Sequence, residues 1–331
     1  MEDASPDRNT HRDGPKSLRE LVRQLNPVHL TLALILLISV VMAIGNSNFL
    51  SLYNANTIAT FGAILLIAAL GQMFAILIGG IDLSIGGTIS LVSVMFVLLV
   101  HKVGYWAYPL CLVTGVVLGY ANGLILTRVK IPSFIATLGT GGIFTSLAYL
   151  VSPRPLSAPP DEYGYFDLVN ASVFGVSNVL VLGFLTFVII FAFLRFTRTG
   201  RNIYFVGSNI KMAWMSGTDI VRTRNVAFMF SGVCAALVGI VISSVRYGGD
   251  PVVGTSYVLN SIAAVVVGGT ALTGGTGGVV SVLFGTLFLS LLDNGMNVVG
   301  INQYFQQALL GAMIILGVAI TFDRTKTPII K

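Results

Sequence analysis

Residues 57–78 read TIATFGAILLIAALGQMFAILI and contain no charged side chain. As a helix rising about 1.5 Å per residue, this stretch is longer than the roughly 30 Å hydrocarbon core of a bilayer. Its apolar residues are continuous rather than alternating, which is the pattern of a membrane helix and not of a β-barrel strand. The stretch therefore predicts a transmembrane helix.

Nine further stretches of the same kind lie along the chain. Only 10% of the 331 residues are charged and 55% are hydrophobic, whereas soluble domains carry about 25% charged residues. Cys111 and Cys234 fall inside apolar stretches, so neither a disulfide framework nor a metal site is indicated, and we expect no bound cofactor. The sequence predicts an all-α polytopic membrane protein with about ten transmembrane helices, at 28–45, 57–78, 83–101, 106–127, 132–152, 177–194, 226–245, 257–274, 278–299 and 303–322.

The basic residues divide the connections between these spans into two classes. If the N-terminus is inside, 16 of the 19 lysines and arginines lie on the cytoplasmic side, and only Lys102, Arg154 and Arg246 lie outside. The net charge of +6 does not indicate a nucleic-acid partner, because the basic residues lie between apolar spans instead of forming one face. The pattern predicts cytoplasmic tails at 1–26 and 324–331 and a transmembrane domain at 27–323, with an outside loop at 153–176 and a cytoplasmic loop at 195–225.

One stretch leaves the topology open. Residues 79–87 read GGIDLSIGG, and no basic residue nearby indicates which side of the membrane they face. Glycines and a carboxylate at membrane depth are tolerated where the backbone is buried in protein or lines a cavity. We therefore expect a re-entrant segment or an interrupted helix, with Gly80, Asp82, Ser84 and Gly86 at the break. Whether Asp82 and Asp293, the carboxylates in or near the spans, are functional or structural is left open.

A short helix is predicted inside the cytoplasmic loop. Ser208 or Asn209 can cap its first turn, and Gly217 can close it in the left-handed conformation. We expect Ile210, Ala213 and Trp214 to share one face, packed either on the ends of the protein's own helices or in a cleft on a soluble partner. The predicted docking residues are Ser208, Asn209, Ile210, Lys211, Met212, Ala213, Trp214, Met215, Ser216 and Gly217.

Four motifs follow one another along the chain: GGIDLSIG at 79–86, IPSFIATLG at 131–139, the loop from GRNIY at 200–204 to SG at 216–217, and VGGT at 267–270 with GG at 274–275. In this order they resemble the permease subunits of bacterial ABC importers for monosaccharides of the ribose, xylose, arabinose and galactose type. The resemblance implies that 207–218 is a coupling helix that docks on an ATP-hydrolysing subunit; Trp214 replaces the usual arginine there, which suggests a more apolar cleft on the partner. It also implies a periplasmic sugar-binding protein, a second permease copy and a location among the lipids of the bacterial inner membrane.

The energy source is expected to be another chain. A phosphate-binding loop needs a Gly-Lys pair, and the sequence has none, so we do not expect this chain to be an enzyme. The alternative is a self-sufficient secondary carrier or facilitator for a small polar solute, which would need ionisable groups at membrane depth. Such groups are scarce, which favours the importer subunit.

Polar and aromatic residues inside the spans are candidates for a sugar path, since neutral polyols are held by amides, hydroxyls and aromatic faces. A weak internal repeat accompanies them: NGL at 122–124 and NGM at 294–296 lie 172 residues apart, in spans predicted to run in opposite directions. A competing match pairs 79–80 with 268–269. Neither the sugar nor the choice between homodimer and heterodimer is predicted. The candidate path residues are Asn122, Phe134, Thr137, Asn294, Gln303, Phe305 and Gln306.

Overall fold

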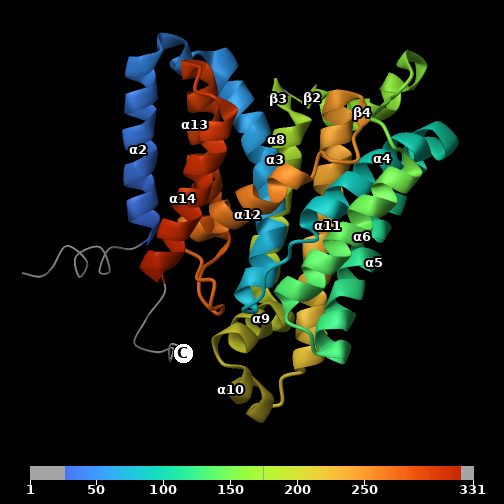
Figure 1. The fold of residues 1–331 in the computed structure, drawn as a ribbon, viewed down its shortest axis with the longest axis vertical. Helices are drawn as coiled ribbons and strands as arrows, with labels where there is room; N and C mark the ends of the chain where they lie inside the picture. Colours follow the sequence, from blue (N-terminus) through green and yellow to red (C-terminus); the bar gives the residue numbers. More distant parts are fainter. Residues whose placement is uncertain (1–26, 174, 322–331) are drawn as a thin grey trace, which may run out of the picture.

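The computed structural model describes residues 27–173 and 175–321. Each of the ten predicted spans is occupied by a helix, so the expected all-α membrane architecture is confirmed (Figure 1). These helices are α2 (Pro27–Gly45), α3 (Leu52–Leu77), α4 (Ile85–Val103), α5 (Ala107–Leu124), α6 (Ser133–Val151), α8 (Asn178–Phe196), α11 (Ile220–Arg246), α12 (Thr255–Val267), α13 (Val279–Val299) and α14 (Gln303–Thr321).

The connections between the long helices are themselves folded. Two 3-10 helices, η1 (Ser47–Leu50) and η2 (Gly104–Trp106), follow α2 and α4, and a π-helical turn, η3 (Ile125–Val129), extends α5. Two short helices, α9 (Arg198–Ser208) and α10 (Ile210–Met215), follow α8. The remaining elements are β1 (Leu156–Ser157), which pairs with β4 (Gly248–Gly249), β2 (Ser172–Val173), which pairs with β3 (Val176–Ser177), η4 (Pro160–Phe166) and α7 (Asp167–Asn170).

The eighth predicted span is shorter than expected. Six helical segments of the described chain are long and apolar enough to cross a membrane, and one of them, Ile85–Val129, contains both α4 and α5. The helix α12 is not among them, because it ends at Val267 instead of residue 274. Glycines stop it: Gly269, Gly274 and Gly275 all have positive φ, which a helix does not contain. Residues 268–278 therefore form a turn-rich connection to α13.

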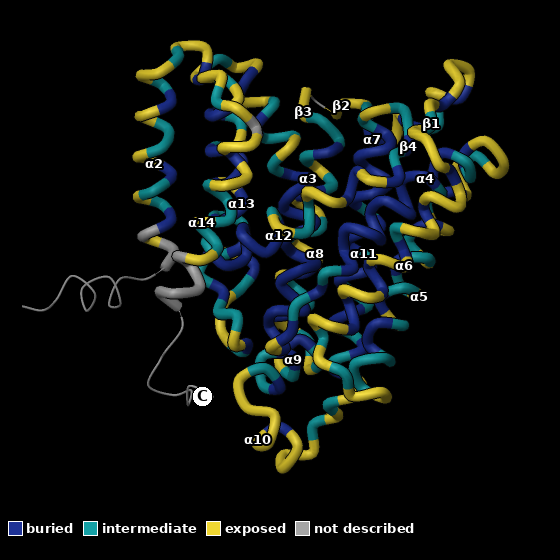
Figure 2. Tube along the Cα trace, in the orientation of Figure 1, coloured by how far each residue is buried: buried dark blue, intermediate teal, exposed yellow. Residues whose placement is uncertain are grey.

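The core of the bundle is built around α3 and α11 (Figure 2). Every residue of α3 from Ala63 to Leu77 is buried, and so is every residue of α11 from Val238 to Ser244. A helix that is apolar on all sides has neighbours on all sides, and α11 packs on α3, α4 and α5. The α5 contact is close because Gly115 faces Gly232, where a Cβ on either residue would collide with the other's carbonyl oxygen.

The order α3, α4, α5, α6 recurs as α11, α12, α13, α14, with corresponding helices beginning 168 to 172 residues apart. The two series run in opposite directions, because α3 ends beside the α9–α10 junction whereas α11 begins just after α10. The 172-residue match therefore joins corresponding helices, α5 and α13. The competing match is wrong: the glycine pair after α11 that corresponds to 79–80 is 248–249, between α11 and α12, and not 268–269.

The predicted outside loop is a compact cap at the end of the bundle opposite α10 (Figure 1). Phe166 is fully buried, and its ring lies edge-on to Phe96 of α4. Tyr108 Oη donates to the carbonyl oxygen of Tyr165 at 2.8 Å. Tyr165 and Phe166 thus attach this loop to α4 and α5.

Candidate functional site

The chain breaks after α3 because two glycines close the helix. Gly79 has a φ of +75°; its N–H donates to the Ile76 carbonyl at 2.9 Å, and the Gly80 N–H donates to the Ala75 carbonyl at 2.8 Å. These two bonds, with the left-handed glycine between them, form a Schellman motif. The expected interruption is confirmed as a separation of α3 from α4, and α4 then runs in the direction of α11, since Gly239 approaches Ile89.

Asp82 lies in the extended segment between the two helices and is 2% exposed. Its Oδ1 accepts from the Ser84 amide at 2.9 Å and from Ser84 Oγ at 2.6 Å, and its Oδ2 accepts from Ser231 Oγ at 2.7 Å. The side-chain amide of Gln72 pairs with the Asp82 backbone, donating to the carbonyl at 2.9 Å and accepting from the N–H at 3.2 Å. Both carboxylate oxygens and both backbone groups therefore have partners, as burial of a polar residue requires.

The hydrogen bonds of Asp82 continue into α5 and α6. Asn122 Nδ2 donates to Ser84 Oγ at 2.6 Å, and Thr140 Oγ1 donates to Asn122 Oδ1 at 2.6 Å. We call Gln72, Asp82, Ser84, Asn122, Thr140 and Ser231 the Asp82 network; it joins the break to α3, α5, α6 and α11.

The start of α6 holds the same extended segment directly. Ser133 Oγ accepts from the Ile81 N–H at 3.1 Å, and Thr137 Oγ1 accepts from the Leu83 N–H at 3.0 Å. Two orphan amides of the break are thereby satisfied by side chains one helical turn apart. The position of α6 is coupled to the backbone at 81–83.

The predicted path residues fall into two groups. Asn122 and Thr137 are buried and hydrogen-bonded at the break, and Gln306 is buried on α14, where its Nε2 donates to Asn297 Oδ1 at 3.0 Å. Phe134 on α6 and Phe305 on α14 are exposed, and Asn294 is half-buried, with an Oδ1 that has no hydrogen-bond partner in the described structure. The side chain of Gln303 lies outside the described part. Their role in a path stays a prediction.

Sequence reasoning missed three members of this site, namely Gln72, Ser231 and Ser133. Gln72 could have been identified from the sequence, because it is the one amide side chain in the stretch 57–78, which is otherwise nearly all apolar. Ser231 lay in an apolar run of α11 with nothing to single it out. Ser133 was part of the IPSFIATLG motif at 131–139 but had no assigned contact.

The predicted short helix is present as α10 and projects from the lower end of the bundle (Figures 1 and 2). Asn209 is its cap, since Asn209 Oδ1 accepts from the Met212 N–H at 3.0 Å, and Gly217 closes it with a φ of +74°. The amphipathic helix α9 supports it from above, burying Ile203 and Val206 against the bundle. Both caps keep this six-residue helix formed, although so short a helix is unstable alone.

The exposed face of α10 differs from the predicted one. Ala213 is buried, but Trp214 is 71% and Met215 is 67% exposed, so Ala213 and Trp214 do not share a face. The reason is that adjacent positions on a helix point about 100° apart, and the small Ala213 fits against the bundle. A large apolar surface of Met212, Trp214 and Met215 is left uncovered outside the apolar spans.

A junction of three backbones joins α10 to the break. The Gly275 N–H donates to the Leu77 carbonyl at 2.9 Å. A Cβ on Gly207 would collide with that carbonyl oxygen and would lie 2.6 Å from Gly275 N, and a Cβ on Gly275 would lie 2.5 Å from Ser208 Cα. The end of α3, the α9–α10 turn and the connection after α12 therefore touch without side chains between them. We call Leu77, Gly207, Ser208 and Gly275 the glycine junction.

The chain matches proteins of known class along most of its length. The profile of the family described as branched-chain amino acid transport system / permease component matches residues 54–318. The ribose import permease protein RbsC of Bacillus subtilis is 33% identical over 297 residues, which cover 87% of this chain and 90% of that protein. The D-allose transport system permease protein AlsC of Escherichia coli is 32% identical over 296 residues, covering 87% and 89%.

A third relative, the probable ABC transporter permease protein YphD of Escherichia coli, is 32% identical over 309 residues and covers 91% of both chains. No solved structure gives a significant match. A profile match over most of the chain and identities above 30% agree with the helical architecture and with the resemblance carried by the four motifs. The chain therefore belongs to this permease family and is a multi-pass membrane protein.

Proposed function

We propose that this chain is the membrane subunit of an ATP-binding-cassette importer that carries a monosaccharide or a similar polyol across the bacterial inner membrane. The relatives named as ribose and D-allose permeases support the substrate class. Amides and hydroxyls in the spans suit a neutral polyol, which needs no charged ligand. The separate ATP-hydrolysing subunit is inferred from the name of the YphD relative and from α10.

The observation that carries the proposal is the uncovered apolar face of α10. Trp214 and Met215 project at the end of the bundle, on a helix that is preformed by its two caps. Aromatic and methionine side chains are enriched where proteins dock. We assign this face to a cleft on the ATP-hydrolysing subunit, with 208–217 as the coupling segment.

The charges support a cytoplasmic position for the α10 end and for both tails. The outside residues of the charge map are Lys102, Arg154 and Arg246, and all three lie at or beyond the helix ends far from α10 (Figure 1). The loops at the α10 end carry most of the basic residues, and cytoplasmic loops of membrane proteins are enriched in lysine and arginine. The compact cap at 153–176 then faces the periplasm.

We assign that cap to the sugar-binding protein. Asp161 and Asp167 are exposed on it, whereas Glu162 is buried and paired with His101. The cap thus offers two free carboxylates on a rigid, aromatic-packed base. Charge reversal at Asp161 and Asp167 is expected to slow capture of the loaded binding protein without affecting ATP hydrolysis by the ATPase.

A second membrane chain, identical or related, completes the path. Phe134 and Phe305, two of the predicted path residues, are exposed on the surface of a single copy. They lie on corresponding helices of the two repeats, α6 and α14. A path that includes both therefore needs another chain to enclose it, and lipid covers the rest of the apolar surface.

The mechanism we infer is alternating access driven through the glycine junction. Closure of the ATPase pair displaces α10. Gly207 and Ser208 transmit the displacement to Leu77, because the backbones are in direct contact with no side chain between them. The break and its hydrogen bonds to Ser133 and Thr137 pass it to α6. The displacement thus reaches α6, which carries the candidate path residues Phe134 and Thr137, without the protonation or deprotonation of any side chain.

The test uses the two tryptophans of the chain. Trp214 and Trp106 are 71% and 72% exposed at opposite ends of the molecule, so Trp106→Ala is a matched control for Trp214→Ala. In proteoliposomes with the cognate ATPase and receptor, Trp214→Ala should weaken ATPase binding by roughly tenfold or more, as for a hot-spot residue. Deletion of 208–217 should abolish ATP-driven uptake while membrane insertion persists. Normal uptake after that deletion would sink the docking assignment.

A further inference from the structure

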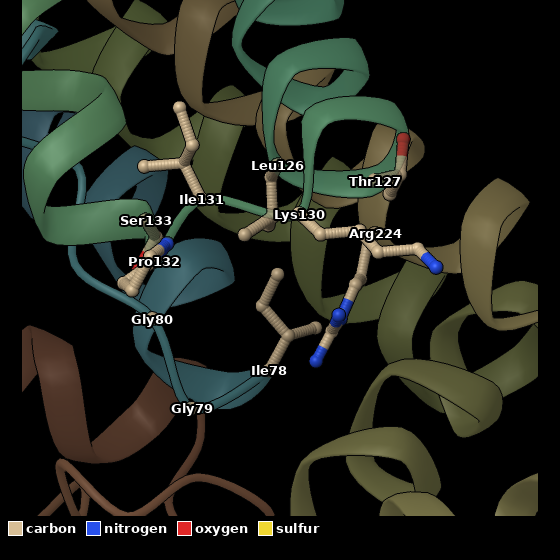
Figure 3. A pocket seen from close by; sticks show the side chains of 10 residues that line it. All are labelled: Ile78, Gly79, Gly80, Leu126, Thr127, Lys130, Ile131, Pro132, Ser133 and Arg224. Carbon is tan, nitrogen blue, oxygen red and sulfur yellow. The ribbon is translucent and has the colours of Figure 1, made fainter.

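A pocket of about 520 Å³ opens beside the break, at the same end of the molecule as α10 (Figure 3). Its walls are the end of α3 with Gly79 and Gly80, the π-helical turn and the loop after it, and the start of α6 and of α11. The volume exceeds that of one water, about 30 Å³, by more than tenfold. The pocket therefore has room for a group larger than a water molecule.

The pocket is cationic. Lys130 and Arg224 both line it, and its ten lining residues include no carboxylate. Arg224 Nε is buried and has no hydrogen-bond partner in the described structure. Two like charges in one pocket repel each other, and a buried guanidinium nitrogen without a partner is costly. An anion in the pocket would relieve both costs.

The backbone around Lys130 is built in an unusual way. The π-helical turn Ile125–Val129 is a rare conformation that recurs at functional sites. Lys130 follows it in the left-handed region with a φ of +61°, although it is not a glycine. Such a conformation is unfavourable for a residue with a side chain and persists where the surroundings favour it. Here it keeps Lys130 on the wall of the pocket.

The remaining polar groups fit the same kind of ligand. The hydroxyls of Thr127 and Ser133 line the pocket. The Thr127 hydroxyl already donates to the Gly123 carbonyl at 2.7 Å, so Ser133, whose Oγ accepts from the Ile81 N–H, is the hydroxyl that can donate to a ligand. The first turn of α6 has no side-chain cap. Hydroxyls, cations and free helix amides are the donors that bind phosphate. No aromatic ring lines the pocket, so it lacks the stacking surface of a sugar site.

We propose that this pocket, which we call the 130–224 pocket, binds a phosphate group. The group belongs either to an anionic phospholipid of the adjacent leaflet or to a free phosphorylated compound. Basic pockets between membrane helices bind lipid headgroups in this manner. Because Ser133 also bonds the Ile81 amide, an occupied pocket would hold the break and α6 in one arrangement.

The experiment uses the full-length permease in nanodiscs. Thermal unfolding is measured in phosphatidylcholine alone, in phosphatidylcholine with phosphatidylglycerol, and in phosphatidylcholine with inorganic phosphate at matched ionic strength. A rise in Tm with phosphatidylglycerol alone identifies a lipid headgroup. A saturable rise with inorganic phosphate identifies a soluble phosphate compound. A wild-type protein that responds to neither overturns the proposal.

The variants are Arg224→Gln and Lys130→Gly, with Arg222→Gln as the control, since Arg222 is exposed on the same helix and does not line the pocket. Lys130→Gly removes the charge and suits the left-handed backbone, so it is expected to fold. Each pocket variant should weaken phosphate or lipid binding by roughly tenfold or more, the effect of one lost charge-assisted hydrogen bond. Pocket variants that respond like Arg222→Gln, or an Arg222→Gln that loses the response equally, would refute the assignment.

Discussion

Gly207→Ala is the sharpest probe of the glycine junction. The new Cβ would collide with the Leu77 carbonyl oxygen and would lie 2.6 Å from Gly275 N, against the 3.0 Å below which real Cβ atoms are essentially not found. These are the two ends of one hydrogen bond, 2.9 Å long. The methyl group would therefore force α9 away from α3, break that bond, or do both.

The magnitude follows from three contributions. The lost hydrogen bond costs about 0.5–1.5 kcal/mol, overpacking costs about 1–3 kcal/mol, and the higher helix propensity of alanine offsets at most about 1 kcal/mol. The net effect is a destabilisation of the junction by about 2 kcal/mol, a factor of roughly thirty in the equilibrium between its closed and separated forms.

The assay measures sugar uptake and ATP hydrolysis together in proteoliposomes that contain the ATPase and the receptor. We expect Gly207→Ala to bind the ATPase normally, because Trp214 and Met215 are untouched, but to transport less sugar per ATP hydrolysed. Gly311→Ala, on α14, is the matched control, since a Cβ at Gly311 meets nothing within 4 Å. An unchanged Tm together with an unchanged ratio of sugar to ATP would refute the proposed route.

Three further predictions concern the hydrogen bonds of the break and of the α10 cap. Asp82→Ala removes a carboxylate that accepts three hydrogen bonds and should lower the free energy of unfolding by about 3 kcal/mol or more. Asp82→Asn should cost less and should retain ATP-driven uptake in the absence of an ion gradient. Uptake that is lost only when an ion gradient is collapsed would instead indicate a secondary carrier. Ser231→Ala should lower the free energy of unfolding by about 1–3 kcal/mol, because it leaves Asp82 Oδ2 buried without a partner. The control is Ser208→Ala, which removes an exposed hydroxyl and should leave the stability unchanged. Asn209→Ala should weaken ATPase docking, because it removes the N-terminal cap of α10, which is worth about 1 kcal/mol. Asn209→Gly should cost only about a few tenths of a kcal/mol. Equal effects of the two variants in a binding assay would contradict the capping role.

The sequence was sufficient for the features set by local chemistry. Continuous apolar stretches predicted the helices, and glycine with an Asn or Ser cap predicted both ends of α10. Even the break after α3 was visible, because Gly79 and Gly80 leave a helix little choice. Where the predicted span at 257–274 was too long, the cause was local as well: positive φ at Gly269 and Gly274 stops α12 at Val267.

The site itself depends on long-range contacts that sequence spacing does not carry. Ser231 reaches Asp82 across 149 residues, and Gly275 reaches Leu77 across almost 200. Nothing in the sequence singles out Ser231, and Gly275 belongs to a quoted motif that does not reveal its partner. The exposure of Trp214 could not be predicted from the sequence for a related reason. It depends on which side of α10 packs on the bundle, and the fit of Ala213 decides that.

The segment 77–84 joins the α9–α10 turn to the break, which is why we propose one mechanism for both. Its first residue, Leu77, is locked to Gly275 and abuts Gly207, which is two residues before the α10 cap. Its far end, through Ile81, Leu83 and Ser84, is bonded to α6 and to the Asp82 network. A flexible connection would dissipate a displacement, but this one is fixed at both ends by hydrogen bonds in a buried setting. We expect the carboxylate of Asp82 to hold this connection in place, so that a displacement of α10 would pass through Leu77 and residues 81–83 to α6, which carries Phe134.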